Sequence, residues 1–176
     1  MKSIYILTAV AIFFALIGIY FYVNPAKPPV VTTFAECEKA GYPVMESFPR
    51  KCQPAEGNAF IDYVSNAQEK NDLIKVSNPK EKDIIKSPMN LEGEARGFWY
   101  FEASFPGRIV DAYGETLRSF VVQADAEWMT EDFVPFKEEI VFADAPTKEG
   151  AIILDKDNPS GLPENADKII IPIRFR

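Results

Sequence analysis

The stretch from residue 89 to residue 136 constrains the fold most, because apolar side chains recur at every second position and both tryptophans lie within it. A period of two is typical of a β-strand that buries one face. The first such run has on its apolar side Ala95, Gly97, Trp99, Phe101, Ala103 and Phe105. The pattern returns at Phe120, Val122 and Ala124, and the Asp and Gly within 111–115 indicate a turn between the two runs. We therefore expect an antiparallel β unit that centres the core here.

Further runs predict the rest of a β domain. Strands are expected at residues 72–76, 83–86, 94–105, 107–111, 116–125, 138–142, 150–154 and 168–175. Seven to eight strands at this spacing are typical of an antiparallel β-sandwich. Because Pro172 cannot donate a ladder hydrogen bond, the last strand should lie at an edge or carry a bulge.

Short motifs in this region resemble those of one bacterial family. In chain order they are Ser87-Pro88, LEGEARG at 91–97, Trp99, FEASFP at 101–106, Trp128-Met129-Thr130, Pro135-Phe136 and Asn158-Pro159-Ser160-Gly161. Over residues 72–176 the chain resembles the immunoglobulin-like domain that occurs, alone or beside a GerM domain, in spore-germination and sporulation proteins. The resemblance implies an immunoglobulin-like sandwich of seven to eight strands outside the cytoplasmic membrane, without known catalysis. It implies little about the ligand.

The N-terminal run predicts a membrane anchor. Residues 4–23 are 20 residues without a charge, and a helix of that length, at about 1.5 Å per residue, spans roughly the 30 Å core of a bilayer. The apolar region of a signal peptide is shorter, about 7–15 residues. We therefore expect residues 1–23 to be an uncleaved anchor, with a cleaved signal peptide as the alternative. Lys2 favours a cytoplasmic N-terminus, and the prolines of residues 24–33 predict an extended spacer.

The only two cysteines, Cys37 and Cys52, lie within residues 34–53. Outside the cytoplasm such a pair predicts a disulfide, and closing a loop of about 15 residues contributes roughly 3 kcal/mol. A redox or metal-binding pair is the alternative, although the spacing differs from C-x-x-C. Residues 54–71 then predict a linker with a short helix that begins at Asn58, and residues 72–176 form the sandwich.

Charge and composition exclude several classes of function. The net charge is −7 and the sequence pI about 4.8, so the surface repels phosphate backbones and we expect no nucleic-acid partner. The chain has no histidine, and it therefore lacks the usual general base and the commonest zinc ligand. We expect no enzyme activity, no cofactor and no metal. The acidic loop 155–167 raises a calcium hypothesis, but Pro159 and Ser160 break the EF-hand pattern and favour a turn.

Two aromatic surfaces are candidate binding sites. Phe98 and Tyr100 fall on the more polar side of the strand predicted at 94–105. A second surface mixes aromatic and acidic residues, and its rings are Trp128, Phe133 and Phe136. Aromatic residues are enriched at interfaces, and an apolar patch outside the core also suits a carbohydrate platform. For both surfaces the alternative is packing within the protein itself.

These features predict a single-pass, membrane-anchored module at the bacterial cell envelope, with its sandwich outside the cytoplasm and a role in protein binding or structure. The resemblance adds a link to spore germination. The expected partner is an envelope protein or a glycan. The alternatives are a glycan- or peptidoglycan-binding module, which exposed Phe98 and Tyr100 would favour, and a cell-wall hydrolase, which a convergent pair of carboxylates in a deep pocket would support.

Overall fold

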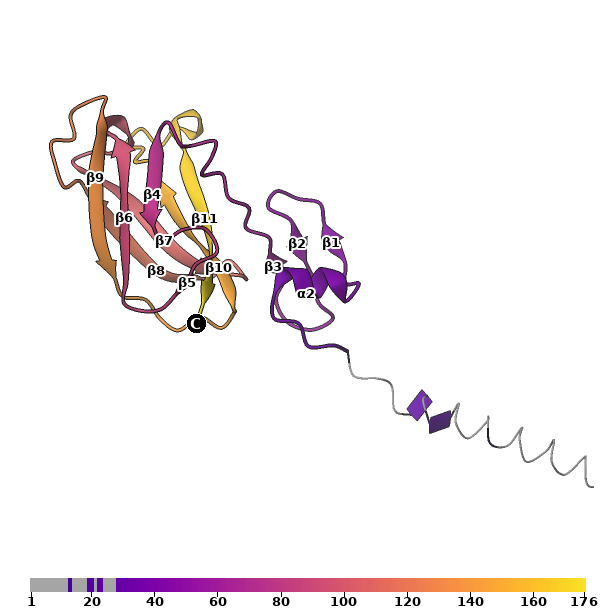
Figure 1. Cartoon of the computed structure of the whole chain (residues 1–176). Coiled ribbons are helices and arrows are strands. Elements are labelled where there is room, and N and C mark those ends of the chain that lie inside the picture. Colours follow the sequence, from indigo (N-terminus) through magenta and orange to yellow (C-terminus); the bar gives the residue numbers. More distant parts are fainter. Residues whose placement is uncertain (1–12, 14–18, 21, 24–27) are drawn as a thin grey trace, which may run out of the picture. The chain divides into compact units, whose positions relative to one another are not determined.

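The computed structural model describes residue 13, residues 19–20, residues 22–23 and residues 28–176 (Figure 1). Contacts divide the chain into two compact units, Met1–Val30 and Val31–Arg176. Most of the predicted anchor at 1–23 and residues 24–27 of the predicted spacer lie outside the described residues. Among the residues that are described, no helix is long and apolar enough to cross a membrane.

The second unit begins with a small module that the disulfide holds together. It contains α2 (Phe34–Lys39) and a three-stranded sheet of β1 (Val44–Met45), β2 (Lys51–Cys52) and β3 (Phe60–Ile61), in that order. The predicted disulfide between Cys37 and Cys52 is confirmed, with both residues fully buried. The short helix expected after Asn58 is wrong, because the chain there forms β3 and pairs with β2. We call residues 34–61 the Cys module.

The predicted all-β sandwich is confirmed, with eight strands in two sheets (Figure 1). One sheet has the order β4-β6-β9 and the other β5-β11-β10-β7-β8. The strands are β4 (Ile74–Asn78), β5 (Ile84–Ile85), β6 (Met89–Arg96), β7 (Ser104–Asp111), β8 (Thr116–Gln123), β9 (Phe133–Ile140), β10 (Glu149–Asp155) and β11 (Lys168–Phe175). This order is immunoglobulin-like. The sheet β4-β6-β9 corresponds to strands A, B and E of an immunoglobulin domain, and β11-β10-β7 corresponds to strands G, F and C.

The core lies between the two sheets, on the inward side of each alternating strand. Phe105 of β7 and Phe136 of β9 meet edge to face across it, with ring centroids 5.4 Å apart. Ile152 of β10 lies beside Ile109 and Ile171 on the neighbouring strands, and all three are buried. The period-two pattern thus places the same face of every strand inward.

The single strand predicted at 94–105 is wrong. β6 ends at Arg96, a 3₁₀ turn follows at η1 (Gly97–Trp99), and β7 begins only at Ser104. Between them lies a two-residue turn in which Glu102 and Ala103 both have positive φ, 49° and 60°. The dipeptide Glu-Ala does not predict a two-residue hairpin turn with positive φ, because Asn-Gly is the sequence typical of such turns. The alternation of apolar and polar residues therefore continues in the sequence across a turn at which the chain reverses direction.

The last strand, β11, is only locally an edge. β5 lies outside it but pairs with Arg174 and Phe175 alone. Further back along β11, the side chain of Asn66 takes the place of a strand: its amide nitrogen donates to the Lys168 carbonyl (2.9 Å) and its oxygen accepts from the Ile170 amide (2.8 Å). Pro172 lies between the part of β11 that pairs with β5 and the part that binds Asn66. At this position no neighbouring strand requires a backbone N–H from β11.

The Cys module packs on the turn between β7 and β8. Ile61 of β3 donates its backbone N–H to the Ala112 carbonyl, 2.7 Å away. Ala112 is buried in one cluster with Phe34, Phe60 and the disulfide. The turn predicted at 111–115 is confirmed, since the Asp111 carboxylate accepts from the N–H groups of residues 113 and 115.

Candidate functional site

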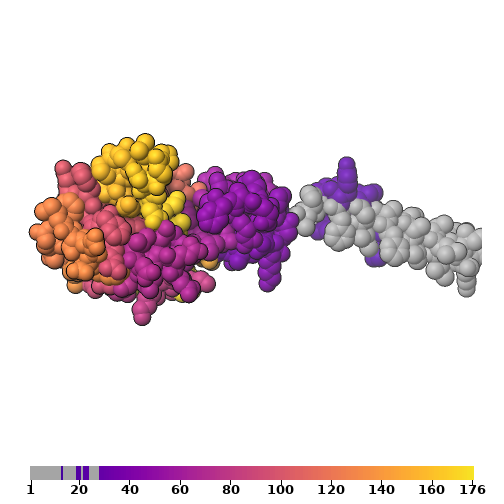
Figure 2. Space-filling model, turned by 90° about the horizontal axis from the view of Figure 1, so that it is seen from above, coloured from indigo at the N-terminus to yellow at the C-terminus, as the bar shows by residue number. Residues whose placement is uncertain are grey.

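Three loops meet at one end of the sandwich, at the top of Figure 1 and facing the viewer in Figure 2. They are residues 97–103, 124–132 and 156–167. The topology gathers them because β6, β8 and β10 end where β7, β9 and β11 begin. Backbone bonds join them: Ala124 donates to the Ala103 carbonyl (2.9 Å) and Asp157 to the Trp99 carbonyl (3.0 Å). We call this surface the loop end.

The loop end carries a strong negative charge. Its three loops hold one lysine, Lys156, and eight carboxylates: Glu102, Asp125, Glu127, Glu131, Asp132, Asp157, Glu164 and Asp167. The difference equals the net charge of the entire chain, −7. The rest of the chain is therefore balanced in sign. Only one of these carboxylates, Asp167, forms an ion pair, with Lys70 (2.7 Å), in the part of the chain that the structure describes.

Apolar side chains are exposed among these acids. Phe98 exposes 50% of its surface, Phe101 41%, Met129 74% and Leu162 49%. Lys156 Nζ lies 5.9 Å from the centre of the Phe98 ring. This exposed ring therefore already has a cation over it. Exposed aromatic and Met side chains beside acids form a surface that suits an apolar, cationic partner.

Tyr100 and Phe136 belong to the core. They expose 3% and 2% of their surface, and the Tyr100 hydroxyl donates to the Val134 carbonyl at 2.9 Å. Burial, with a smaller contribution from Asp125, raises the pKa of Tyr100. The predicted platform of Phe98 beside Tyr100 is therefore wrong, because the 3₁₀ turn directs the two rings to opposite sides, one outward and one into the core.

Phe133 and Trp128 take intermediate positions. Phe133 lies on the outer face of the three-stranded sheet between two cations, with Lys75 Nζ 3.8 Å and Arg96 Cζ 4.1 Å from its ring centre. Trp128 is partly buried against the main core. Of the five predicted aromatic residues, the structure leaves Phe98 most exposed, and it adds Phe101, which the sequence pattern had assigned to the buried side.

Loop 124–132 is held tightly against η1. The Arg96 guanidinium donates to the Glu131 carbonyl (3.1 Å) and to the Asp72 carbonyl (3.0 Å). A Cβ at Gly97 would collide with the carbonyl oxygens of Trp128 and Thr130, so only glycine permits this approach. The loop therefore presents its acids from a fixed backbone.

The loop 156–167 contains the predicted turn. Gly161 donates its N–H to the Asn158 carbonyl (3.1 Å), and the Asn158 side chain donates to the Leu162 carbonyl (2.8 Å). A short 3₁₀ turn, η2 (Pro163–Asn165), follows. No group of three or more acidic or Cys side chains is arranged to hold a metal ion among the described residues.

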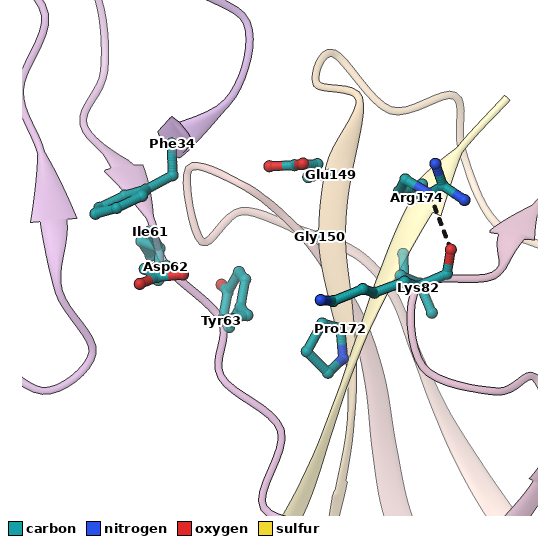
Figure 3. A pocket seen from close by; sticks show the side chains of 10 residues that line it. Phe34, Ile61, Asp62, Tyr63, Lys82, Glu149, Gly150, Pro172 and Arg174 are labelled. Atoms are coloured by element: carbon teal, nitrogen blue, oxygen red, sulfur yellow. Dashed lines mark hydrogen bonds between the residues drawn. The ribbon is translucent and has the colours of Figure 1, made fainter. Parts of the chain in front are cut away.

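A second candidate site is a cleft of about 430 Å³ beside the Cys module (Figure 3). It is lined by Phe34, Ile61, Asp62, Tyr63, Lys82, Glu149, Gly150, Pro172, Ile173 and Arg174. No sequence motif predicts this cleft, because its walls come from stretches that lie far apart in the chain. Its residues include two acids and two bases, whereas the loop end is almost purely acidic.

Burial perturbs two groups in this cleft. It raises the pKa of the Glu149 carboxyl above its ordinary value of 4.5, and the charges of Glu36 and Asp62 raise it further. It also raises the pKa of Tyr63 to about 12, with a smaller contribution from the charge of Asp111. Both shifts have the same physical cause, which is the removal of water from the wall between the Cys module and the sandwich.

Comparison with known proteins agrees with the topology. The family model for the immunoglobulin-like domain of bacterial spore germination (Gmad2) matches residues 73–161. The match spans β4 to β10 and two complete connections of the loop end, 97–103 and 124–132. It leaves out the Cys module. No curated protein and no solved structure matches the chain.

Proposed function

Because the chain belongs to the family of the immunoglobulin-like domain of bacterial spore germination, we propose that it is a binding module and that the loop end is its recognition surface. The family is not a known enzyme family, which favours binding over catalysis. We propose further that residues 4–23 anchor the chain and that the sandwich acts outside the cytoplasmic membrane. The partner would be an envelope protein in a germination-related process.

The observation that carries this proposal is the coincidence of charge and exposed apolar surface. The net negative charge of the chain resides in the same three loops that expose Phe98, Phe101 and Met129. Single-sign charge accelerates encounter with an oppositely charged partner. Exposed aromatic residues then supply the buried contacts that hold it. The partner that fits is a cationic protein segment with apolar side chains.

The same features weigh against the other candidates. A polyanionic partner meets repulsion at this surface. The glycan-binding alternative loses the platform on which it rested, because Tyr100 is buried. The hydrolase alternative retains one supporting observation, which is the presence of Asp62 and Glu149 on one cleft.

The test uses the full chain in detergent micelles and a fluorescent peptide of alternating lysine and phenylalanine, with a glutamate-phenylalanine peptide as its control. We expect anisotropy to show binding of the cationic peptide alone. The double variant Phe98→Ala/Phe101→Ala should weaken it about tenfold, as loss of an interface anchor does. Its matched control is Ile84→Ala/Val141→Ala, since these apolar side chains are also exposed but lie at the opposite end of the sandwich.

Two double variants that each remove two negative charges complete the test. Glu131→Gln/Asp132→Asn should reduce the association rate and its dependence on salt, whereas Glu46→Gln/Glu56→Gln, which changes exposed acids of the Cys module, should not. Equal effects of the two pairs would refute the loop end as the recognition surface. Release of soluble fragments from peptidoglycan by the wild type, lost in Glu149→Gln, would instead support the hydrolase.

A further inference from the structure

We propose that the cleft beside the Cys module binds a small zwitterion with an apolar side chain, the chemical class of free amino acids and dipeptides. This site is separate from the loop end and does not depend on the function proposed for it. Its size is suitable, because about 430 Å³ falls within the range of about 300–1,000 Å³ typical of small-molecule sites.

One part of the cleft is anionic. Asp62, which directly follows the Cys module, and Glu149, which begins β10, both line it (Figure 3). The carboxylates repel each other, which is why the charge of Asp62 raises the pKa of Glu149. An ammonium group placed between them would relieve that repulsion, and it would replace for Glu149 the interaction with water that burial removes.

Asp62 is fixed in place before any ligand arrives. Arg50 binds it through two nitrogens, Nε at 3.1 Å and Nη2 at 2.7 Å, both to Oδ2. The same guanidinium lies over the Phe34 ring at 4.8 Å. The second carboxylate oxygen, Oδ1, makes no hydrogen bond to the residues that the structure describes, and it therefore remains available to a cation.

The positive charge of the cleft comes from Lys82 and Arg174. Arg174 lies opposite Glu149 in the register of β10 and β11, and its charge partly offsets the raised pKa of that carboxyl. The backbone of Lys82 is pinned to β11: its N–H donates to the Pro172 carbonyl (2.7 Å) and its own carbonyl accepts from Arg174 Nε (2.9 Å; Figure 3). Lys82 holds a left-handed backbone, φ 63°, which costs a non-glycine residue about 1–2 kcal/mol. Residues in such conformations cluster at functional sites, where surrounding contacts maintain them.

Both cations have capacity for a ligand. Lys82 Nζ and the two Nη groups of Arg174 form no hydrogen bond or ion pair within the described part of the chain. In Figure 3 the Lys82 side chain extends into the cleft towards Tyr63. A planar guanidinium with free N–H groups suits a carboxylate, which it binds through two parallel hydrogen bonds.

Apolar groups lie between the charged ones. Phe34, Ile61 and the ring of Tyr63 line the side of the Cys module, and Pro172 lies opposite. The Cys module is held rigid here, because Phe34 packs in the cluster that contains the disulfide. A ligand with an ammonium group, a carboxylate and an apolar side chain therefore matches all three kinds of surface.

The test is calorimetric titration of the full chain in detergent with L-leucine and L-leucyl-L-leucine. For the zwitterion that binds, two analogues remove one charge each: an N-acetyl form without the ammonium and a C-terminal amide without the carboxylate. We expect each analogue to bind at least tenfold more weakly, because a hydrogen bond to a charged group contributes about 1.5–3 kcal/mol.

Variants locate the site. Arg174→Gln and Glu149→Gln should each weaken the zwitterion at least tenfold, whereas the matched exposed pair Arg118→Gln and Glu115→Gln should leave it unchanged. Thermal unfolding of each variant confirms that it is folded. Phe98→Ala/Phe101→Ala should also have no effect, so failure at the loop end and failure at the cleft are distinguishable. The proposal is overturned if neither zwitterion binds at millimolar concentration, if an analogue binds equally well, or if Arg174→Gln and Glu149→Gln bind like the wild type.

Discussion

The loop end and the cleft differ in how the chain builds them. The loop end consists of three continuous connections, each of which carries its own acids and apolar residues. The cleft consists of single residues from β10, β11, the turn before β5 and the border of the Cys module, and it carries side chains of both charges. A surface made of continuous segments retains its chemical character whatever the exact path of the chain. A cleft made of scattered residues exists only when several elements pack correctly.

The largest expected effect is a difference in unfolding free energy between variants of two aromatic residues that are close in sequence, Phe98 and Tyr100. Tyr100→Ala should cost about 3–5 kcal/mol of unfolding free energy, because it empties a buried aromatic site and leaves the Val134 carbonyl without its hydrogen bond. Phe98→Ala should cost less than about 1 kcal/mol, since half of that side chain is exposed. Urea denaturation of both variants measures the difference. Equal losses would mean that the assignment of Tyr100 to the core is wrong.

Removing the disulfide should break the cleft and spare the loop end. Cys37→Ser/Cys52→Ser should lower the stability of the Cys module by about 3 kcal/mol, from the entropy of the opened loop. Zwitterion binding should disappear, because Phe34 and Asp62 lose their support, while peptide binding at the loop end remains. Calorimetry and anisotropy on one preparation measure both, with wild type under reducing agent as the control. Loss of both activities together would show that the two regions are not independent.

The turn at Glu102 and Ala103 offers a gain in stability. Both residues have positive φ, and Asn-Gly adopts that conformation with less strain. Glu102→Asn/Ala103→Gly should therefore raise the unfolding free energy by about 1–2 kcal/mol. Glu102→Gln removes the charge alone and serves as the control. A double variant that is no more stable than this control would contradict the strained turn.

The smallest effect concerns the pH dependence of stability. Since burial raises the pKa of Glu149, the folded state holds its proton more tightly than the unfolded state. That contribution is fully present below the ordinary carboxyl pKa and is lost as the pH rises through the raised value. Glu149→Gln should therefore be more stable than the wild type at neutral pH, by less than about 1 kcal/mol because the group is only partly buried, and the advantage should vanish in acid. A difference that is constant from pH 4 to pH 8 would exclude titration of Glu149 as its cause.

Several elements follow from local rules and were predicted correctly. The strands at 116–125 and 168–175 follow from alternation. The strand at 150–154 follows from a short apolar run, and the structure buries both of its faces. The turn at 111–115 follows from an Asp side chain that caps backbone N–H groups. The disulfide follows from two cysteines in one short segment. Motifs in the same region sufficed to recognise the family.

The predictions that were wrong, and the interactions that were not predicted, depend on contacts between segments that are distant in the chain. The path from Arg96 to Ser104 turns out of the strand because both Trp99 and Tyr100 enter the core, although they are adjacent and alternation would place them on opposite faces. The cap of Asn66 on β11 joins residues about a hundred positions apart. Neither interaction leaves a local signal in the sequence.

By itself the sequence determined that this chain forms a disulfide-bonded segment followed by an immunoglobulin-like sandwich with an acidic surface, because burial, turn chemistry and charge act through neighbouring residues. Only the tertiary structure decided which aromatic side chains are exposed at the loop end and that Asp62, Lys82, Glu149 and Arg174 share one cleft. Those outcomes depend on the packing of one element against another, and packing brings together side chains that the order of the chain keeps apart.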